Sequence, residues 1–164
     1  MSDQPTDLAE LDLNLEAFMR EALAEAEEAG RAGELPIGAV LVIDGEIVSR
    51  GRAGHQEARS QLMHAEMQAL LAGGEALWEH HDRAVLFTTV EPCPMCLGAT
   101  VMADVPHIVF AAADAVAGSR QIVETVPYVR RHIRSFLGGV LEDEAWELIR
   151  DVDPTWYRYV KGGV

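Results

Sequence analysis

Hydrophobic and polar positions follow two different periods along the chain, and these periods predict where its first helix and strands lie. Over 13–29, apolar side chains recur every three to four residues, which predicts an amphipathic helix. A β-branched apolar run over 37–43 predicts a buried strand. Asp44 and Gly45 then form a sequence typical of a tight hairpin turn, so we expect a second strand over 46–49 to pair with the first.

The rest of the chain continues to alternate between helical and extended patterns. In chain order the patterns predict a loop over 51–60, a helix over 61–71, a strand over 84–90, a helix opened by Pro92 over 93–103, a strand over 107–111, a helical region over 121–136 interrupted near Pro127, and a helix over 142–150. Trp78 and Trp146 lie at apolar helical positions and are predicted to be in the core. Helices that alternate with strands favour a three-layer α/β architecture, with a sheet covered on both faces.

Length and composition indicate a single globular domain. The chain has 164 residues, of which 49% are apolar and 24% charged. We expect a flexible acidic lead-in over 1–12 and one domain over 13–164, with an aromatic tail over 154–164. No apolar run approaches the roughly 18 residues of a membrane span, and the polar N-terminus does not resemble a secretory signal. The expected location is therefore the cytoplasm.

The charge balance argues against a nucleic-acid partner. The chain has 27 acidic and 13 basic residues, a formal net charge of −14, whereas proteins that bind phosphate backbones are usually basic. Arg130, Arg131 and Arg134 form the one candidate RNA-contact cluster, and the net charge opposes that interpretation.

Two short segments contain residues suited to metal chemistry. Cys93 and Cys96 are separated by two residues near a predicted helix start, where the helix dipole favours thiolates and the spacing suits Zn²⁺. His64 is a candidate third ligand, and three protein ligands leave a fourth position for water, as in catalytic zinc sites. Glu66 lies two residues beyond His64, so its carboxylate is a candidate proton acceptor for that water.

Other interpretations of the two cysteines remain open from the residues alone. They are a redox pair, or a structural zinc site in which His55 or His107 supplies a fourth ligand. A redox pair leaves His64 and Glu66 without a role.

Three segments resemble the cytidine deaminase-like superfamily: 35–40 (LPIGAV), 64–66 (HAE) and 89–99 (TVEPCPMCLGA). His-x-Glu followed by Pro-Cys-x-x-Cys is the general signature of zinc deaminases. The resemblance extends over about 13–149, in the branch that holds fungal-type cytosine deaminase, bacterial guanine deaminase and tRNA-specific adenosine deaminase. It implies a three-layer α/β/α sandwich with a central five-stranded mixed sheet, one Zn²⁺ per subunit and a homodimer.

The resemblance also implies roles for individual residues. His64, Cys93 and Cys96 would bind zinc, and Glu66 would carry protons from water to the base and to the departing amine. The backbone amides of Ala65 and Cys93 would lie beside the base. The implied substrate-binding positions are Ala65, Glu91, Pro36, Ile37, Ala53 and Trp156.

Two positions depart from the pattern of the relatives. Many relatives carry an Asn that hydrogen-bonds the base where this chain has Ala53, so Arg52, His55 and Gln56 are candidates to replace it. Trp156 matches an aromatic residue that covers the base in fungal-type cytosine deaminase, while Tyr159 stands where that family has an acidic residue. We therefore expect Trp156 either to cover a pocket or to pack the tail.

These observations together predict a zinc-dependent hydrolytic deaminase of a small amino-heterocycle. The expected substrate is a free nucleobase or nucleoside, cytosine-like or guanine-like, and the products include ammonia. Nucleic acid is not expected as a partner, because of the net charge and because a covering tail would obstruct a polymer. The alternatives are a tRNA-specific adenosine deaminase and, among non-enzymes, a zinc-stabilised binding module.

Overall fold

A five-stranded mixed sheet forms the centre of the computed structural model, which describes residues 7–162. Its strands are β1 (Gly38–Ile43), β2 (Glu46–Arg52), β3 (Ala84–Val90), β4 (His107–Ala112) and β5 (Ser135–Leu137), arranged in the order β2-β1-β3-β4-β5. β1 pairs antiparallel with both β2 and β3, whereas β3, β4 and β5 run parallel. The predicted hairpin is present, with Asp44 and Gly45 both at positive φ, as a type I′ turn requires.

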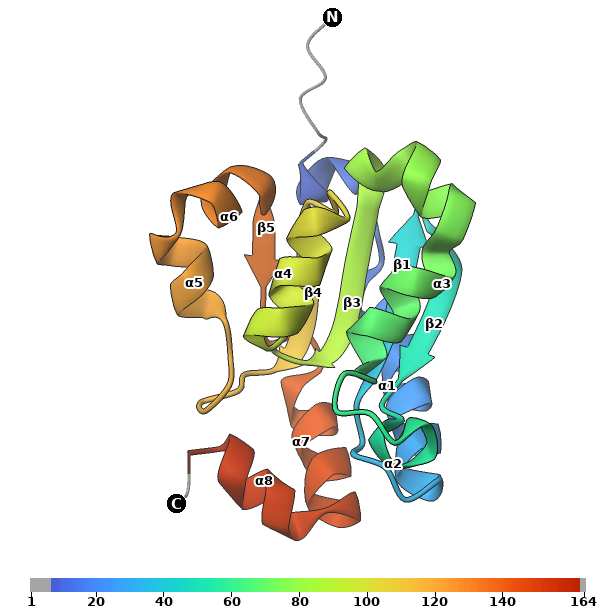
Figure 1. Cartoon of the computed structure of the whole chain (residues 1–164), viewed down its shortest axis with the longest axis vertical. Coiled ribbons are helices and arrows are strands. Elements are labelled where there is room, and N and C mark those ends of the chain that lie inside the picture. Colours follow the sequence, from blue (N-terminus) through green and yellow to red (C-terminus); the bar gives the residue numbers. More distant parts are fainter. Residues whose placement is uncertain (1–6, 163–164) are drawn as a thin grey trace, which may run out of the picture.

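Helices cover both faces of this sheet (Figure 1), so the predicted three-layer fold is confirmed. The longer helices are α1 (Leu15–Arg31), α3 (Ala65–His80), α4 (Pro94–Met102) and α7 (Glu142–Val152). The shorter ones are η1 (Leu8–Leu11), α2 (His55–Ala58), η2 (His81–Arg83), α5 (Arg120–Thr125), α6 (Pro127–His132) and α8 (Pro154–Val160). No helix in the described part of the chain is both long and apolar enough to cross a membrane.

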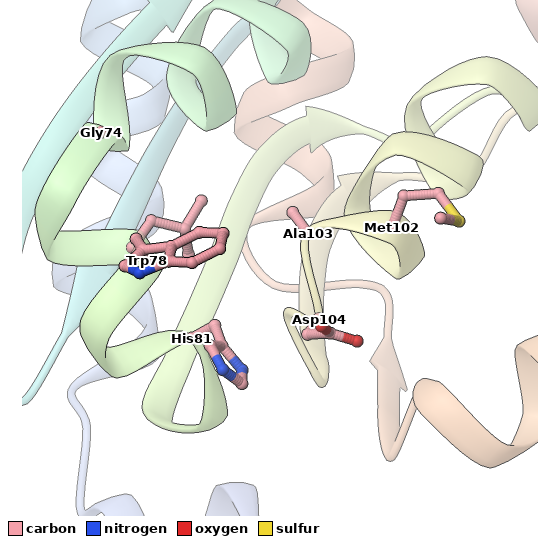
Figure 2. A pocket seen from close by; sticks show the side chains of 7 residues that line it. Gly74, Trp78, His81, Met102, Ala103 and Asp104 are labelled. Carbon is pink, nitrogen blue, oxygen red and sulfur yellow. The ribbon is translucent and has the colours of Figure 1, made fainter.

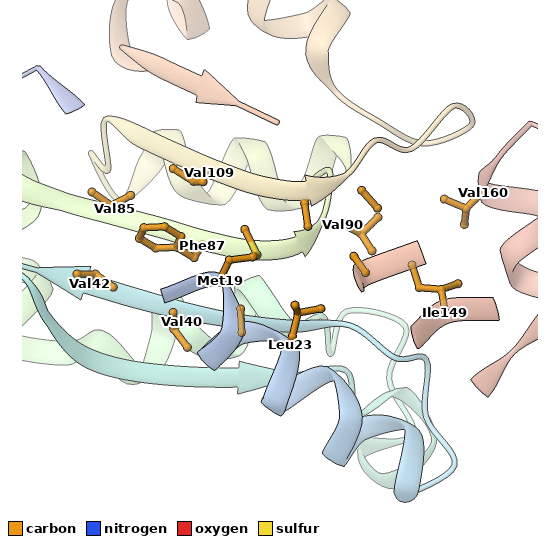
Figure 3. Close-up of a cluster of buried hydrophobic side chains, with 14 residues drawn as sticks. Met19, Leu23, Val40, Val42, Val85, Phe87, Val90, Val109, Ile149 and Val160 are labelled. Carbon is orange, nitrogen blue, oxygen red and sulfur yellow. The ribbon is translucent and has the colours of Figure 1, made fainter. Parts of the chain in front are cut away.

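Alternate residues of each strand fill the two layers of the core. In β1, Val40 and Val42 join the cluster formed with α1 and α7 (Figure 3), while Leu41 and Ile43 pack against α3. This is the period of two expected for a strand, and both faces are apolar because both are covered by helices. The central strands β1 and β3 are buried at every position, which makes them a rigid base for the loops at their ends.

Two glycines allow strands to lie unusually close to helices. A Cβ atom at Gly38 would collide with the backbone of Ala22 in α1, and one at Gly51 would collide with the backbone of Ala65 in α3. Gly51 therefore brings β2 directly against the first residue of α3, where the His-Ala-Glu segment lies.

Several boundaries differ from the sequence predictions. The helix predicted from Pro92 begins instead at Pro94, with Cys93 as its N-cap. The region 121–136 holds two short helices and the edge strand β5, because Pro127 forces the preceding Val126 into an extended conformation (φ −89°, ψ 112°) that separates α5 from α6. The predicted loop 51–60 contains the short helix α2.

The tryptophans and the N-terminal segment show how far the core extends. Trp146 packs against the core as expected, but Trp78 is 84% exposed, so the core prediction for Trp78 is wrong. Helix α3 turns at Gly74, which has φ +50° and ψ −130°, and this break lies one turn before Trp78. Residues 1–6 of the expected lead-in lie outside the described residues, and Leu8 and Leu11 of η1 pack against the core.

Candidate active site

Three potential metal ligands meet at the starts of two helices. The Nδ1 atom of His64 lies 3.7 Å from the Sγ of Cys93 and 3.5 Å from the Sγ of Cys96. These ligand atoms all lie within 4.8 Å of one another, and no other group of this kind is found among residues 7–162. His55 and His107 are not part of it; His107 instead contacts Ser135 at the opposite end of β4.

Local sequence explains why the ligands occupy these places. His64 and Cys93 are the N-cap residues of α3 and α4, and both have the extended backbone typical of that position. Pro94 occupies the first position of α4, where its fixed φ suits the helix. Cys96 lies one turn further on, on the same side as Cys93, so both sulfurs lie near the positive end of the helix dipole.

This donor set fits a catalytic zinc ion. With Zn–S near 2.3 Å and Zn–N near 2.0–2.1 Å, a tetrahedral zinc separates nitrogen from sulfur by about 3.5 Å, close to the distances between His64 and the two cysteines. The backbone of Gln61 also acts on the His64 ring and helps to raise the pKa of His64, the kind of outer contact that orients a metal-binding imidazole. Three ligands from the chain leave one coordination position for water.

Glu66 lies beside this site without belonging to the donor set. Its side chain is buried; one carboxylate oxygen accepts a hydrogen bond from the Thr88 hydroxyl at 3.1 Å, and the other lies 3.5 Å from the Sγ of Cys96. Burial raises the pKa of Glu66 above the ordinary glutamate value. A carboxylate with a raised pKa accepts a proton more readily than an ordinary glutamate does, which suits a proton carrier.

The two thiols differ in protonation in the metal-free site. A hydrogen bond from Cys96 and one from His64 lower the pKa of Cys93 to about 4, despite its partial burial. The same hydrogen bond to Cys93, together with burial, raises the pKa of Cys96. Hydrogen bonding to Cys93 also raises the pKa of His64. In the metal-free site Cys93 is therefore the thiolate of the pair, and zinc must displace the proton of the Cys96 thiol in order to bind both sulfurs.

One of the predicted substrate-binding residues adjoins a zinc ligand in the chain, and three others lie in segments that backbone hydrogen bonds connect to the start of α3. Ala65 is the buried first residue of α3, directly between His64 and Glu66. Pro36 is buried and Ile37 half-buried in the segment that leads into β1, and the Ile37 carbonyl accepts a hydrogen bond from the Ala53 amide at 3.0 Å. Ala53 is only 2% exposed, so position 53 contributes a methyl group and no polar atom.

The structure gives Glu91 and Trp156 contacts within the protein. The carboxylate of Glu91 accepts hydrogen bonds from the backbone amides of Asp114 and Arg120, so it fastens the loop after β4. Trp156 is half-buried against the core at the start of α8, where its amide donates to Asp153. Tyr159, in the same helix, is 54% exposed.

Two residues important for the site were missed by sequence reasoning. Thr88 positions the carboxylate of Glu66 from β3. Glu34 is buried and accepts hydrogen bonds from the backbone amides of Gln56 and Glu57, which fixes α2. The two threonines, Thr88 and Thr89, in an otherwise apolar strand were a possible signal for the first, whereas nothing local distinguishes Glu34 from the many surface acids.

An exposed apolar surface lies between α3 and α4, away from the metal ligands. Trp78 and Met102 line a cavity of about 310 Å³ together with Gly74, His81 and Asp104 (Figure 2). Leu71, on the same helix as Trp78, is 76% exposed, and Met102 is 72% exposed. Apolar side chains this large and this exposed, gathered on adjacent helices, are typical of an interaction surface.

Comparison with known proteins identifies the class of zinc enzyme to which this site belongs. Residues 13–112 match the model of the cytidine and deoxycytidylate deaminase zinc-binding region. Because the match spans more than half of the chain, the chain belongs to this family of zinc-binding deaminases.

Among individual proteins, the chain is similar to tRNA-specific adenosine deaminases. It is 40% identical to that of Bacillus subtilis (strain 168) over 133 residues, covering 79% of this chain and 82% of the relative. It is 44% identical to that of Streptococcus pyogenes serotype M18 over 99 residues, covering 59% of this chain and 62% of the relative. The chain thus spans about three fifths of the streptococcal protein.

Solved structures agree on the fold and include more than one activity. A structure from biochemical and structural studies of A-to-I editing by tRNA:A34 deaminases is 34% identical, with a TM-score of 0.68, over 75% of this chain and 97% of the other. The guanine deaminase of Bacillus subtilis is 32% identical, with a TM-score of 0.59, over 70% and 77% of the respective chains.

These similarities correct two expectations drawn from the sequence. The free nucleobase or nucleoside as substrate, and nucleic acid as an improbable partner, are wrong, because strong relatives are named as tRNA-specific adenosine deaminases. The argument from net charge fails because a total of −14 does not describe the local distribution of charge.

Proposed function

We propose that this chain is a zinc-dependent hydrolytic deaminase that converts adenosine in tRNA to inosine and releases ammonia. The main support is the combination of a donor set that fits catalytic zinc and a buried Glu66 beside it, in a chain 40% identical to a tRNA-specific adenosine deaminase. The neighbouring structure of tRNA:A34 deaminases suggests the wobble position as the target.

The proposed mechanism assigns the proton transfers to Glu66. His64, Cys93 and Cys96 would hold the zinc ion, which would lower the pKa of a bound water to about 7 and so supply the attacking hydroxide. Glu66 accepts a proton from the attacking water and gives it to a ring nitrogen of the base. The water oxygen bonds to the carbon that carries the amine, Glu66 transfers the second proton to the amine, and ammonia leaves as the C–N bond breaks.

The residues around the zinc ligands have supporting roles in this proposal. The backbone amides of Ala65 and Cys93 lie at the helix starts, where partial positive charge favours the electron-rich reacting group. Thr88 holds one oxygen of Glu66, so that the other is directed toward the metal site. The apolar residues Pro36, Ile37 and Ala53 would form a wall for the base in this proposal.

A local basic cluster supports an RNA partner despite the acidic total. Arg130 and Arg131 are exposed on α6, and Arg134 follows the helix; together with Asp7 they border a surface cavity of about 410 Å³. Arg131 lies over the Tyr128 ring, 6.0 Å from its centroid. Within residues 7–162, no carboxylate forms an ion pair with Arg130 or Arg131. We propose phosphate contacts here.

The assembly and location follow from the same proposal. The exposed surface of Leu71, Trp78 and Met102 is proposed as the contact between two copies of the chain in a homodimer. One domain over 13–164 and a cytoplasmic location complete the proposal. A change of Trp78 to glutamate should yield monomers in light scattering coupled to size-exclusion chromatography.

The test is inosine formation measured by mass spectrometry on three substrates: a tRNA transcript with adenosine at the wobble position, its anticodon stem-loop, and free adenosine. The proposal expects inosine in both RNAs and none from the nucleoside. It also expects rates at subsaturating RNA to fall as salt rises. Absence of inosine from both RNAs, with zinc bound, would refute the tRNA substrate.

A further inference from the structure

The loop after β2 borders the metal site, and its backbone is fixed on both sides. The amide of Ala53 donates to the carbonyl of Ile37 at 3.0 Å, and the amide of Gly54 donates to the carbonyl of Met63 at 3.1 Å. Met63 directly precedes His64. These bonds hold the backbone of residues 53–55 between the entry to β1 and the start of α3, beside the segment that carries the zinc ligand His64.

Most side chains in the loop after β2 have no polar group that is free to contact a substrate. Ala53 carries only a methyl group. The guanidinium of Arg52 pairs with Glu25 of α1 at 3.3 Å, on the outer side of the sheet. The side-chain amide of Gln56 donates to the carbonyl of Gly33 at 2.6 Å.

His55 differs from these neighbours because its ring lies against a zinc ligand. The ring centroids of His55 and His64 are 5.0 Å apart and the rings are nearly perpendicular, at 72°. His55 is half-buried, and no group among residues 7–162 forms a hydrogen bond with its ring nitrogens. An imidazole held at this place without a protein partner has one donor or acceptor at each nitrogen to offer to a ligand.

The backbone under His55 is held firmly, which makes a defined contact possible. The buried carboxylate of Glu34 accepts hydrogen bonds from the amides of Gln56 at 2.9 Å and Glu57 at 2.9 Å. His55 also lines a cavity of about 260 Å³ with Glu34, Gln61 and Asp153. The imidazole therefore stands between the zinc ligand His64 and an open space at the surface.

We infer that His55 is a specificity-determining residue, whose imidazole hydrogen-bonds a ring nitrogen of the base that is deaminated. The inference rests on the proposed function for the identity of that base, an adenine. It assigns to His55 the polar contact that position 53 lacks. A buried polar contact of this kind discriminates strongly between bases, because a base without the matching atom leaves the protein group unpaired.

The first test combines a deleted side chain with deleted base atoms. Wild type, His55→Ala and the control Gln56→Ala are compared on stem-loops with adenosine, 7-deazaadenosine or 3-deazaadenosine at the target position. One of the deaza bases should lower single-turnover kcat/KM by about tenfold in wild type and in Gln56→Ala. In His55→Ala, kcat/KM for adenosine should itself fall about tenfold. Replacing adenosine by the same deaza base should then cause no further fall in this variant. Losses that multiply for both deaza bases would overturn the inference.

The second test reads His55 directly and does not depend on turnover. Imidazole ¹⁵N signals of the zinc-loaded protein are followed while a stem-loop with purine ribonucleoside at the target position is added, with the half-buried His80 at the far end of α3 as the internal control. The His55 signals should shift and saturate, while those of His80 remain unchanged. Binding without a shift of His55 would overturn the inference.

The same titration with free purine ribonucleoside separates the two proposals. If the protein binds the free nucleoside with a shift of His55 but ignores the stem-loop, the role of His55 stands and the tRNA substrate is refuted. If neither probe binds, both proposals fail.

Discussion

The zinc site and the loops around it are built in different ways. We call these loops the rim; they are the segment from Ala53 to the end of α2 and the loop between β4 and α5. His64 and Cys93 are N-cap residues, and Cys96 and Glu66 follow within one turn, so short local segments set all four positions. The rim, in contrast, depends on contacts between residues far apart in the chain. Glu34 fixes Gln56 from 22 residues away, and Glu91 fixes Arg120 from 29 residues away.

This difference separates the chemistry of the protein from its selectivity. A site made of two local segments keeps its geometry when the surroundings change, which is consistent with similar solved structures being named for different reactions, tRNA:A34 deamination and guanine deamination. A rim held by long-range hydrogen bonds changes with single substitutions such as the alanine at position 53. The predictions below test whether substitutions in the two regions have separate effects.

The largest effect should come from removing a zinc ligand. Cys96→Ala takes away one of three donors, so we expect loss of bound zinc and a fall in kcat/KM on the order of a thousandfold or more. Zinc content by atomic emission and inosine formation measure the two effects. Met95→Leu, a change between the two cysteines, should leave both intact; a variant at Cys96 that kept full activity would contradict the site.

The second effect should separate proton transfer from metal binding. Glu66→Gln keeps the shape of the side chain but cannot carry the proton, so we expect kcat to fall by about 10²–10⁴-fold with zinc still bound. Glu75→Gln, an exposed carboxylate on the same helix, is the matched control and should be neutral. Loss of zinc in Glu66→Gln would instead make Glu66 a structural residue of the metal site.

Zinc affinity should increase as pH rises. The raised pKa values of Cys96 and His64 keep protons on groups that must release them to bind zinc. Each displaced proton makes the apparent affinity about tenfold tighter per pH unit, over the range below the pKa of the group. Competition with a chromophoric chelator between pH 6 and 8 measures this slope, and an affinity independent of pH would contradict these ligands.

The smallest effect should appear in the rim. Burial raises the pKa of Glu34, but the hydrogen bonds from Glu57 and Gln56 outweigh it and lower the pKa below 4.5. Glu34→Gln weakens these bonds, so we expect the free energy of unfolding to fall by about 1–3 kcal/mol, with zinc content unchanged.

The sign of its pH dependence follows from the lowered pKa. The ionised carboxylate stabilises the folded state above pH 4.5, and this stabilisation is lost as pH falls through the lower folded pKa. The difference between wild type and Glu34→Gln in urea unfolding should therefore shrink in acid. A constant difference from pH 7 to pH 3 would show that the charge of Glu34 has no part in it.

The same division explains which features were predictable from sequence. Hydrophobic periods located β1, β3, β4 and α1, and the His-x-Glu and Cys-x-x-Cys spacings located the zinc ligands, because these signals are local. The three-residue strand β5 was missed because so short a segment has no period, and it forms by pairing with β4. Helix α2 was missed because its anchor, Glu34, lies outside the segment.

The substrate was the least predictable feature. A net charge is a sum over the chain, and it hid the exposed Arg130 and Arg131 on α6. The aromatic tail was expected to exclude a polymer, whereas Trp156 packs against the core at the start of α8. Which group faces the base depends on how the loop from Ala53 is folded, and no local pattern describes that.

The most direct test of the account is a zinc titration of metal-free protein, with inosine formation in the anticodon stem-loop measured at each step. If His64, Cys93 and Cys96 hold the one zinc on which the reaction depends, activity should rise linearly and reach a plateau at one zinc per chain. Activity in the metal-free protein, or a rise that continues past one equivalent, would contradict the assignment of this site as the reaction centre.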